Sequence, residues 1–238
     1  MVEQRRSYLA AFRAAQRNCG EPTVVPAYDD ADVLAGQGTV GVELLADVAA
    51  FDTVIVPIGG GGLIAGISGY LKQRLPRVKV VGVEPVGAAA MTASFDAGHP
   101  VTLDRVQTIA DGLAASRPGD ICFEIARLCV DELLLVEEDE MLRAIRLYFE
   151  WEHLLAEPAG SAAMAALLYH YSPSPGDRAA VILSGHTVTD EVMLRALTSR
   201  APVRVSNQQA VRSDMKACDT SNPCPAHATS VATALGGW

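Results

Sequence analysis

One stretch of this chain constrains its fold more than any other. In residues 53–66, TVIVPIGGGGLIAG, an apolar strand runs into four consecutive glycines, and an apolar helix follows at once. Because glycine lacks a Cβ atom, this run can adopt positive φ angles and bring backbone N–H groups close to a ligand. The positive end of the helix that begins at Leu63 points at the same place. The stretch therefore predicts an anion site of the kind that binds a phosphate group.

The order of apolar runs along the chain predicts a parallel sheet flanked by helices. Strands are expected over 23–26, 53–58, 78–83, 133–136 and 179–183, and helices over 3–18, 39–49, 63–74, 119–130, 138–153 and 158–169. The strand, helix and strand over 53–83 form a βαβ unit, which requires parallel pairing. We expect a three-layer α/β fold with a mostly parallel, twisted sheet, in which the last four of these strands are central and buried.

Charge and composition exclude several classes of partner. The net charge of −9 and the low aromatic content argue against nucleic acid and anionic membranes. No run reaches the ~18 apolar residues of a membrane span. The five cysteines are scattered without a CxxC pair, which predicts reduced thiols and a cytoplasmic protein, with Cys122 and Cys129 in the core. Cys218, Cys224 and His227 lack the spacing of a zinc site, so no metal is expected there.

The glycine run permits two interpretations, of which the first is a dinucleotide-binding fold. Gly60, Gly62 and Ala65 satisfy the GxGxxA variant of the dinucleotide fingerprint. Glu84 ends the next strand about 20 residues further on, where an acid that binds a ribose hydroxyl would stand. This interpretation predicts a nicotinamide-dependent oxidoreductase of the Rossmann type.

The second interpretation comes from six motifs in a fixed order. They are YDDADVLAGQGTVGVELL, the glycine run, VVGVEP, IADGLAASRPGD, LLAEPAGSAAMAAL and VILSGHT. Over about residues 5–195 they resemble the fold-type II pyridoxal-phosphate enzymes, specifically the serine/threonine dehydratase (ammonia-lyase) and serine racemase branch. The resemblance implies a tryptophan synthase beta-like fold. It also implies a lyase that converts L-threonine or L-serine to the 2-oxo acid and ammonia.

The resemblance also implies pyridoxal 5′-phosphate as cofactor and assigns residues to it. The phosphate-binding residues are Gly59, Gly60, Gly61, Gly62 and Leu63, and the residue that faces the pyridine nitrogen is Ser184. A neutral hydroxyl leaves that nitrogen largely unprotonated, which suits β-elimination of water. We expect Ser184 to open into the same crevice as the glycine run.

The catalytic lysine of this family has no counterpart here. In the family it lies in a Ser-x-Lys segment upstream of the GQGT motif, and this chain begins after that point. Lys72, Lys79 and Lys216 are expected to be solvated surface charges. The chain is thus expected to be the C-terminal portion of a dehydratase, with no catalytic residue of its own.

That expectation divides the chain into three parts and bears on its partners. The parts are a remnant of the smaller domain (1–22), the C-terminal part of the cofactor-binding large domain (23–198) and a disordered tail (199–238). Alone, the chain is expected to be inactive on an amino-acid substrate. A separate chain with the N-terminal half, or a homo-oligomer, is the expected partner. A non-catalytic remnant that keeps only the phosphate site is the alternative.

Two positions depart from the family in smaller ways, and Glu157 matches a family glutamate. Some racemase-like members bind a divalent cation through a glutamate that matches Glu84, a carbonyl near Ala88 and an acid that matches Ala90. Alanine at position 90 removes an oxygen ligand, so no metal is expected. His186 stands where the family has glycine and is interpreted as a loop residue rather than a titratable group at the ring. Glu157 is expected to form a structural ion pair.

Overall fold

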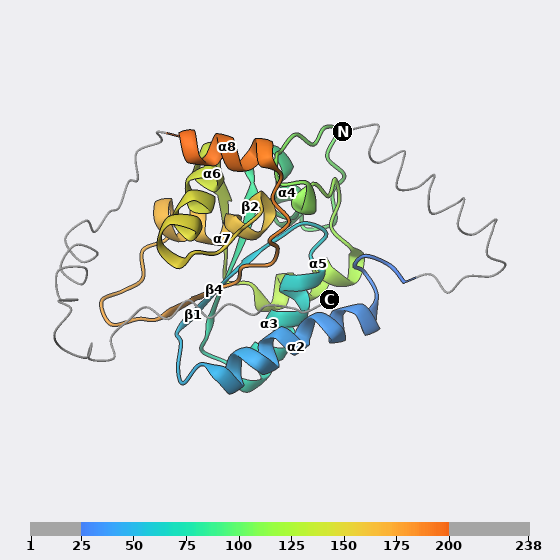
Figure 1. Cartoon of the computed structure of the whole chain (residues 1–238). Coiled ribbons are helices and arrows are strands. Elements are labelled where there is room, and N and C mark those ends of the chain that lie inside the picture. The colour runs from blue at the N-terminus through green and yellow to red at the C-terminus, as the bar shows by residue number, and fades with distance from the viewer. Residues whose placement is uncertain (1–24, 200–238) are drawn as a thin grey trace.

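The structure, a computed structural model, describes residues 25–199 (Figure 1). The helix expected over 3–18, the first half of the strand expected over 23–26, Lys216 and the tail after Ser199 lie outside the described residues. Within residues 25–199, every helix is too short or too polar to cross a bilayer.

Four parallel strands form the sheet, in the order β3-β2-β1-β4. They are β1 (Thr53–Pro57), β2 (Lys79–Pro85), β3 (Glu132–Val136) and β4 (Ala179–Val181). The expected parallel α/β fold is confirmed. The expectation that all four strands are central was wrong, because β3 and β4 are the end strands of the sheet that residues 25–199 form. In β3 only Val136 is fully buried.

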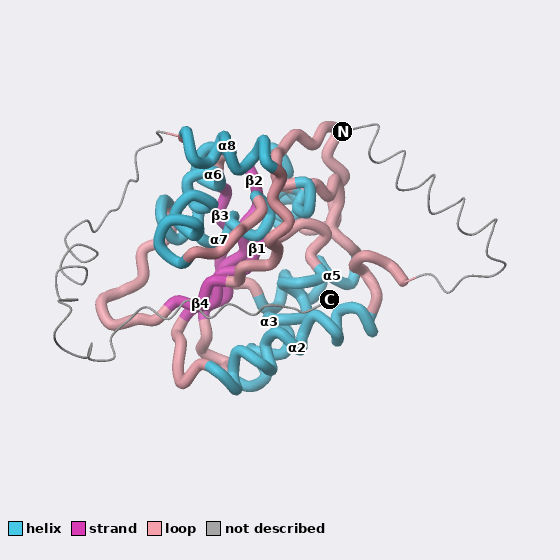
Figure 2. Tube along the Cα trace, in the orientation of Figure 1, coloured by secondary structure: helices cyan, strands magenta, loops and turns pink. Residues whose placement is uncertain are grey.

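Helices cover both faces of the sheet (Figures 1 and 2). The longer ones are α2 (Ala31–Asp47), α3 (Gly62–Arg74), α5 (Asp120–Cys129), α6 (Glu138–Leu147) and α7 (Pro158–Tyr169). One core cluster joins α3 and α5 to the sheet through Ile64, Ile67 and Phe123. The other joins the alanine-rich α7 to the opposite face through Ile55 and Val81. The molecule therefore has three layers, with the sheet between them.

Helix α2 begins eight residues before the predicted helix start at 39. The side chain of Asp30 caps it by accepting hydrogen bonds from the N–H groups of Asp32 and Val33, at 2.9 and 3.2 Å. Residues 31–38, which precede the expected helix, are helical, and Gly38 of the GQG motif serves helix packing. A Cβ atom on Gly38 would lie only 3.2 Å from the carbonyl oxygen of Gly66, so α2 and α3 cross closely.

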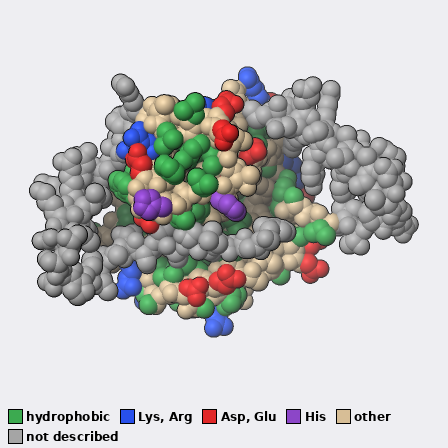
Figure 3. Space-filling model, in the orientation of Figure 1, with side chains coloured by type: hydrophobic (Ala, Val, Ile, Leu, Met, Phe, Trp, Pro, Cys, Tyr) green, Lys and Arg blue, Asp and Glu red, His purple; other side chains and the backbone are tan. Residues whose placement is uncertain are grey.

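Two further helices were not predicted from the sequence. They are α4 (Ala90–Ala97) and α8 (Asp190–Thr198). Within the range of the helix expected over 138–153, a π-helical turn, η3 (Tyr148–Glu152), extends α6. Apolar side chains gather over the upper part of the face in Figure 3, where α6 and α8 lie in Figure 1. Leu194 of α8 is 64% exposed. Arg146 of α6 holds the end of α8 by donating to the carbonyl oxygens of Leu197 and Ser199.

Candidate functional site

The glycine run lies at the carboxyl edge of the sheet, between β1 and α3. Gly61 is the N-cap of α3 and has a φ of +96°, a value that favours glycine. Strand β1 pairs in parallel with β4, with Ile55 opposite Val181. Because parallel neighbours end at the same edge, the glycine run and the turn that starts at Ser184 follow adjacent strand ends. This arrangement at the carboxyl edge was expected from the sequence.

The backbone N–H groups of this loop are available to a ligand. Among the residues that the structure describes, no hydrogen-bond acceptor serves the N–H groups of Gly59 to Leu63. The carbonyl oxygen of Gly60, by contrast, accepts a hydrogen bond from the N–H of Gly119 at 3.0 Å. The loop thus presents several free donors at the positive end of a helix, an arrangement that suits an anion.

The missing Cβ atoms of the glycine run serve close packing as well. A Cβ atom on Gly59 would lie 2.9 Å from the carbonyl oxygen of Gly112, and one on Gly60 would run into the ring of Tyr28. One on Gly61 would lie 2.8 Å from Met91 Cε and 2.9 Å from Cys122 Cβ. These contacts were not predicted from the sequence, from which the four glycines were expected only to let a phosphate approach the backbone.

The segment before α2 packs beside the loop and was not recognised from the sequence. Asp29 has a φ of +57°, unusual for a residue with a side chain. Its Oδ1 accepts a hydrogen bond from the N–H of Ile121 at 2.7 Å, in the first turn of α5. Cys122 follows in that turn, and burial raises the pKa of its thiol. The prediction that Cys122 is a core residue is confirmed, whereas Cys129 is only half-buried.

Ser184 is exposed, and its hydroxyl has no hydrogen-bond partner within residues 25–199. The turn that follows is held by Glu157, the N-cap of α7. Its Oε2 accepts a hydrogen bond from the N–H of Thr187 at 3.1 Å. The ion pair expected for Glu157 is absent among the described residues. His186 lies on the same turn, is exposed and is outside any helix or strand, in agreement with its interpretation as a loop residue.

Glu84 does not do what the dinucleotide interpretation requires. Its side chain is fully buried, and its carboxylate accepts hydrogen bonds from Met91 N at 2.7 Å, Thr92 N at 2.8 Å and Thr92 Oγ1 at 2.6 Å. A carboxylate occupied by the first turn of α4 cannot bind a ribose hydroxyl, so that interpretation was wrong. Within the described residues, no group of three His, Cys, Asp or Glu side chains is arranged to hold a metal ion.

Neither described lysine lies near the glycine run. Lys72, near the C-terminal end of α3, donates to Asp131 Oδ2 at 2.7 Å and to the Val78 carbonyl at 2.8 Å. Lys79 begins β2 and pairs with Glu132 at 2.7 Å. Both belong to the amino edge of the sheet. The prediction of a solvated surface charge was wrong for Lys72, whose side chain is only 20% exposed.

The residues at the carboxyl edge suit two groups of pyridoxal phosphate, its phosphate and its ring nitrogen. Free N–H groups at a helix N-terminus are suited to a phosphate, which carries negative charge and several acceptor oxygens. A neutral hydroxyl is suited to a pyridine nitrogen, which accepts one hydrogen bond. The described residues offer no lysine to the aldehyde carbon. The described residues at this edge are therefore chemically suited to the phosphate and the ring nitrogen of the cofactor, and they include no lysine that could attach it covalently.

Known proteins share this sequence pattern. Residues 2–185 match the family described as pyridoxal-phosphate dependent enzyme. The L-threonine ammonia-lyase of Thermotoga maritima is 38% identical over 182 residues, which cover 76% of this chain and 45% of that protein. A catabolic L-threonine dehydratase of Escherichia coli is 45% identical over 144 residues, or 60% of this chain and 44% of the relative. The chain thus spans less than half of each of these two relatives.

Solved structures share the fold. The processed form of threonine deaminase isoform 2 from Solanum lycopersicum superimposes with a TM-score of 0.72 at 31% identity, covering 80% of this chain and 56% of that one. Maize serine racemase gives a TM-score of 0.71 at 32% identity, covering 81% and 59%. The family match, the relatives and the parallel fold agree. This chain belongs to the pyridoxal-phosphate dependent enzyme family.

Proposed function

We propose that this chain is the cofactor-binding portion of a lyase that converts L-threonine or L-serine to a 2-oxo acid and ammonia. One observation carries the proposal. The glycine run offers N–H groups that have no acceptor among the described residues, at the sheet edge where Ser184 follows β4. The names of the relatives, an L-threonine ammonia-lyase and an L-threonine dehydratase, favour threonine as the substrate.

In this proposal the chain's residues bind and orient rather than transfer protons. Gly59, Gly60, Gly61, Gly62 and Leu63 donate N–H groups to the phosphate. Ser184 offers its hydroxyl to the ring nitrogen without a formal charge. Bound pyridoxal phosphate supplies the electron sink that makes the α-proton of an amino acid acidic. Lys72 and Lys79 are held in ion pairs at the other edge of the sheet, so neither serves as the base.

The proposal includes a partner and a compartment. A segment that carries the missing lysine has to contact the carboxyl edge, and it comes from an N-terminal half or from another chain. A homo-oligomer of this chain alone would bring only further copies of its three lysines, none of which lies in a Ser-x-Lys segment. We further propose a cytoplasmic location, supported by the free thiols of Cys122 and Cys129.

Binding and activity of the 238-residue chain test the proposal together. Pyridoxamine 5′-phosphate, which has no aldehyde to react with surface lysines, should bind with saturation, and inorganic phosphate should compete. Borohydride treatment in the presence of pyridoxal phosphate should label no single lysine stoichiometrically. L-Threonine should yield no 2-oxobutanoate, since loss of acid–base catalysis alone typically lowers rates by ~10²–10⁴-fold.

Two further measurements distinguish a two-part enzyme from a non-catalytic remnant. Activity that appears on adding a separately expressed Ser-x-Lys segment from a relative would support the two-part enzyme. Continued inactivity of that mixture, with cofactor bound, would favour the non-catalytic alternative. Selective labelling of Lys72 or Lys79 together with 2-oxobutanoate formation would contradict the proposed inventory of residues.

A further inference from the structure

Glu157 contacts both sides of the turn that carries Ser184. Its backbone N–H donates to the carbonyl oxygen of Gly185 at 3.2 Å, and its Oε2 accepts from the N–H of Thr187 at 3.1 Å. Glu157 therefore bonds to two backbone groups that follow Ser184, the carbonyl of Gly185 and the N–H of Thr187. A turn held at two points has few alternative conformations.

Three glycines allow these segments to meet. A Cβ atom on Gly185 would run into the Glu157 carboxylate, and one on Gly160 would lie 2.8 Å from the N atom of Gly185. One on Gly112 would lie 3.0 Å from Ala159 Cβ and 3.7 Å from Glu157 Oε1. The carboxylate thus lies where α7, the turn after β4 and the segment Asp111–Leu113 converge. Gly112 in turn borders Gly59, so contacts continue to the glycine run.

The charge of this carboxylate has specific neighbours. Burial raises the pKa of the Glu157 carboxyl above its ordinary value; the Thr187 N–H opposes that rise, Asp111 adds to it and His186 opposes it. Asp111 belongs to the segment before α5, and His186 to the turn itself. No Lys or Arg among the described residues pairs with Glu157. The ionised form is therefore maintained mainly by the turn that it holds.

We propose that Glu157 is a positioning residue that orients Ser184 toward the cofactor ring by holding the turn from Ser184 to Thr187 with its ionised carboxylate. This role rests on the proposed function. Because Glu157 does not border the glycine run directly, its loss should affect recognition of the ring and leave recognition of the phosphate group. Protonation of the carboxyl should have the same effect as its replacement.

The test separates ring recognition from phosphate recognition. The affinities of the full chain for pyridoxamine 5′-phosphate and for inorganic phosphate are measured, and their ratio reports the ring. Glu157→Gln should lower this ratio about tenfold, because the amide oxygen of glutamine is a weaker acceptor for the Thr187 N–H than an ionised carboxylate, with phosphate affinity changed less than about twofold. In the wild type the ratio should also fall on acidification, at a higher pH than for an ordinary glutamate, whereas Glu157→Gln should lack this step.

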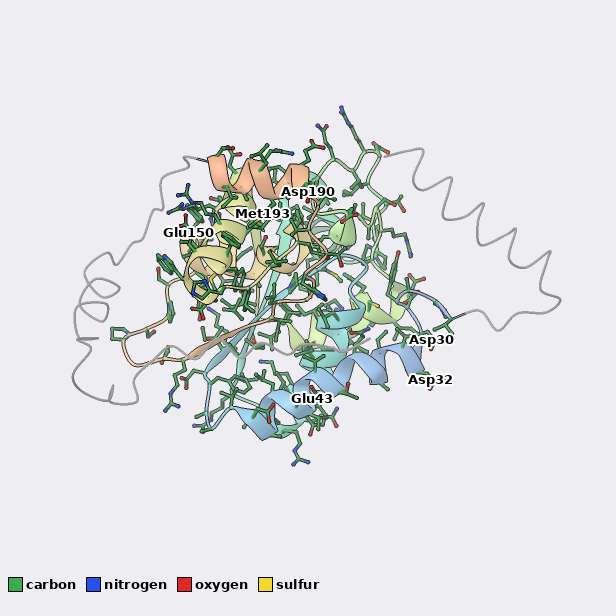
Figure 4. The ribbon with its side chains drawn as sticks, in the orientation of Figure 1. Asp30, Asp32, Glu43, Glu150, Asp190 and Met193 are labelled. Carbon is green, nitrogen blue, oxygen red and sulfur yellow. The ribbon has the colours of Figure 1, made fainter. Side chains whose placement is uncertain are left out.

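Control variants keep the test specific. Glu43→Gln changes an exposed glutamate on α2, outside the carboxyl edge (Figure 4), and should leave both affinities unchanged. Gly185→Ala displaces the carboxylate from the other side, so its effect and that of Glu157→Gln should be less than additive. If Glu157→Gln does not fold, Gly185→Ala and the wild-type pH profile give the result.

Each outcome has one meaning. An unchanged ratio in Glu157→Gln, or an equal loss of both affinities, would overturn the positioning role while the proposed function stands. Wild-type chain that binds neither ligand would overturn the proposed function and the positioning role together. A lower ratio of the two affinities in Glu157→Gln, together with loss of the fall on acidification, would support the positioning role.

Discussion

The two edges of the sheet treat their polar groups in opposite ways. At the amino edge, Lys72 and Asp131 form an ion pair at 2.7 Å, and Asp131 also accepts from the N–H of Val80. Lys79 pairs with Glu132 there. At the carboxyl edge, the N–H groups from Gly59 to Leu63 have no acceptor among the described residues, although Gly61 and Gly62 are buried.

This difference indicates which edge of the sheet needs a ligand. Polar groups that are removed from water without a partner are costly, by about 1–3 kcal/mol each. The amino edge meets that demand with its own side chains, so it needs nothing further. The carboxyl edge leaves several donors together, and a phosphate would satisfy them at once. The edges can be tested separately, because substitutions at one should spare the property of the other.

The largest effect is expected from Gly61→Val. Valine would have to adopt a φ of +96° and place its Cβ within 2.9 Å of Met91 and Cys122 atoms. Backbone strain and overpacking together should lower the free energy of unfolding by about 3 kcal/mol, and cofactor binding should be lost. Urea unfolding and titration with pyridoxamine 5′-phosphate measure the two effects.

Gly98→Val is the matched control for this substitution. Gly98 also has a positive φ, +75°, but a Cβ atom there would meet nothing within 4 Å. Only the strain should remain, about 1–2 kcal/mol, with ligand affinity unchanged. Equal losses of stability in the two variants would show that the contacts around Gly61 contribute nothing.

A smaller effect is expected from Asp29→Ala beside the glycine run. The substitution removes the acceptor of the Ile121 N–H and leaves alanine at a φ of +57°. The loss should be about 2 kcal/mol in the free energy of unfolding. Asparagine tolerates this conformation and keeps a side-chain oxygen, so Asp29→Asn should lose less than about 1 kcal/mol. Chemical unfolding of both variants would reveal which contributes more to the loss of stability, the strained backbone at position 29 or the hydrogen bond to the Ile121 N–H.

The buried carboxyl of Glu84 should make stability depend on pH. Burial raises its pKa, although the hydroxyl and N–H of Thr92 and the N–H of Met91 oppose the rise. The folded protein therefore keeps this proton to a higher pH than the unfolded chain. Relative to Glu84→Gln, the wild type should be most stable below about pH 4 and lose about 1.4 kcal/mol per unit of raised pKa as pH rises through the folded value. Parallel stability profiles for the two proteins between pH 4 and 8 would contradict this sign.

The smallest effect is expected at the amino edge. Lys72→Met should lower the free energy of unfolding by about 1 kcal/mol, because the ion pair with Asp131 is only partly buried. Cofactor affinity should not change. Arg127→Met, which breaks an exposed pair with Glu124, should lie within about 0.5 kcal/mol of the wild type. A loss of cofactor binding in Lys72→Met would undermine the separation of the two edges.

The sequence was informative where one local pattern determined one element. The run from Thr53 to Gly66 predicted a strand, a loop and a helix, and the structure has all three. The expected start of helix α2 was eight residues too late, because the packing of Gly38 against Gly66 of α3 is a contact between residues distant in sequence. The position of Glu157 beside the turn after β4 could not be predicted, because it depends on contacts with Gly185 and Gly112, which are distant in sequence.

The hydrogen bond between Gly119 and Gly60 has a consequence for how the loop recognises an anion. In a trans peptide the carbonyl oxygen and the N–H point in opposite directions, so fixing the oxygen of Gly60 also fixes the N–H of Gly61. A donor that is already oriented loses little conformational freedom when its ligand arrives. In the proposed phosphate site, part of the affinity would therefore come from preorganisation supplied by the turn before α5, a segment that need not touch the ligand.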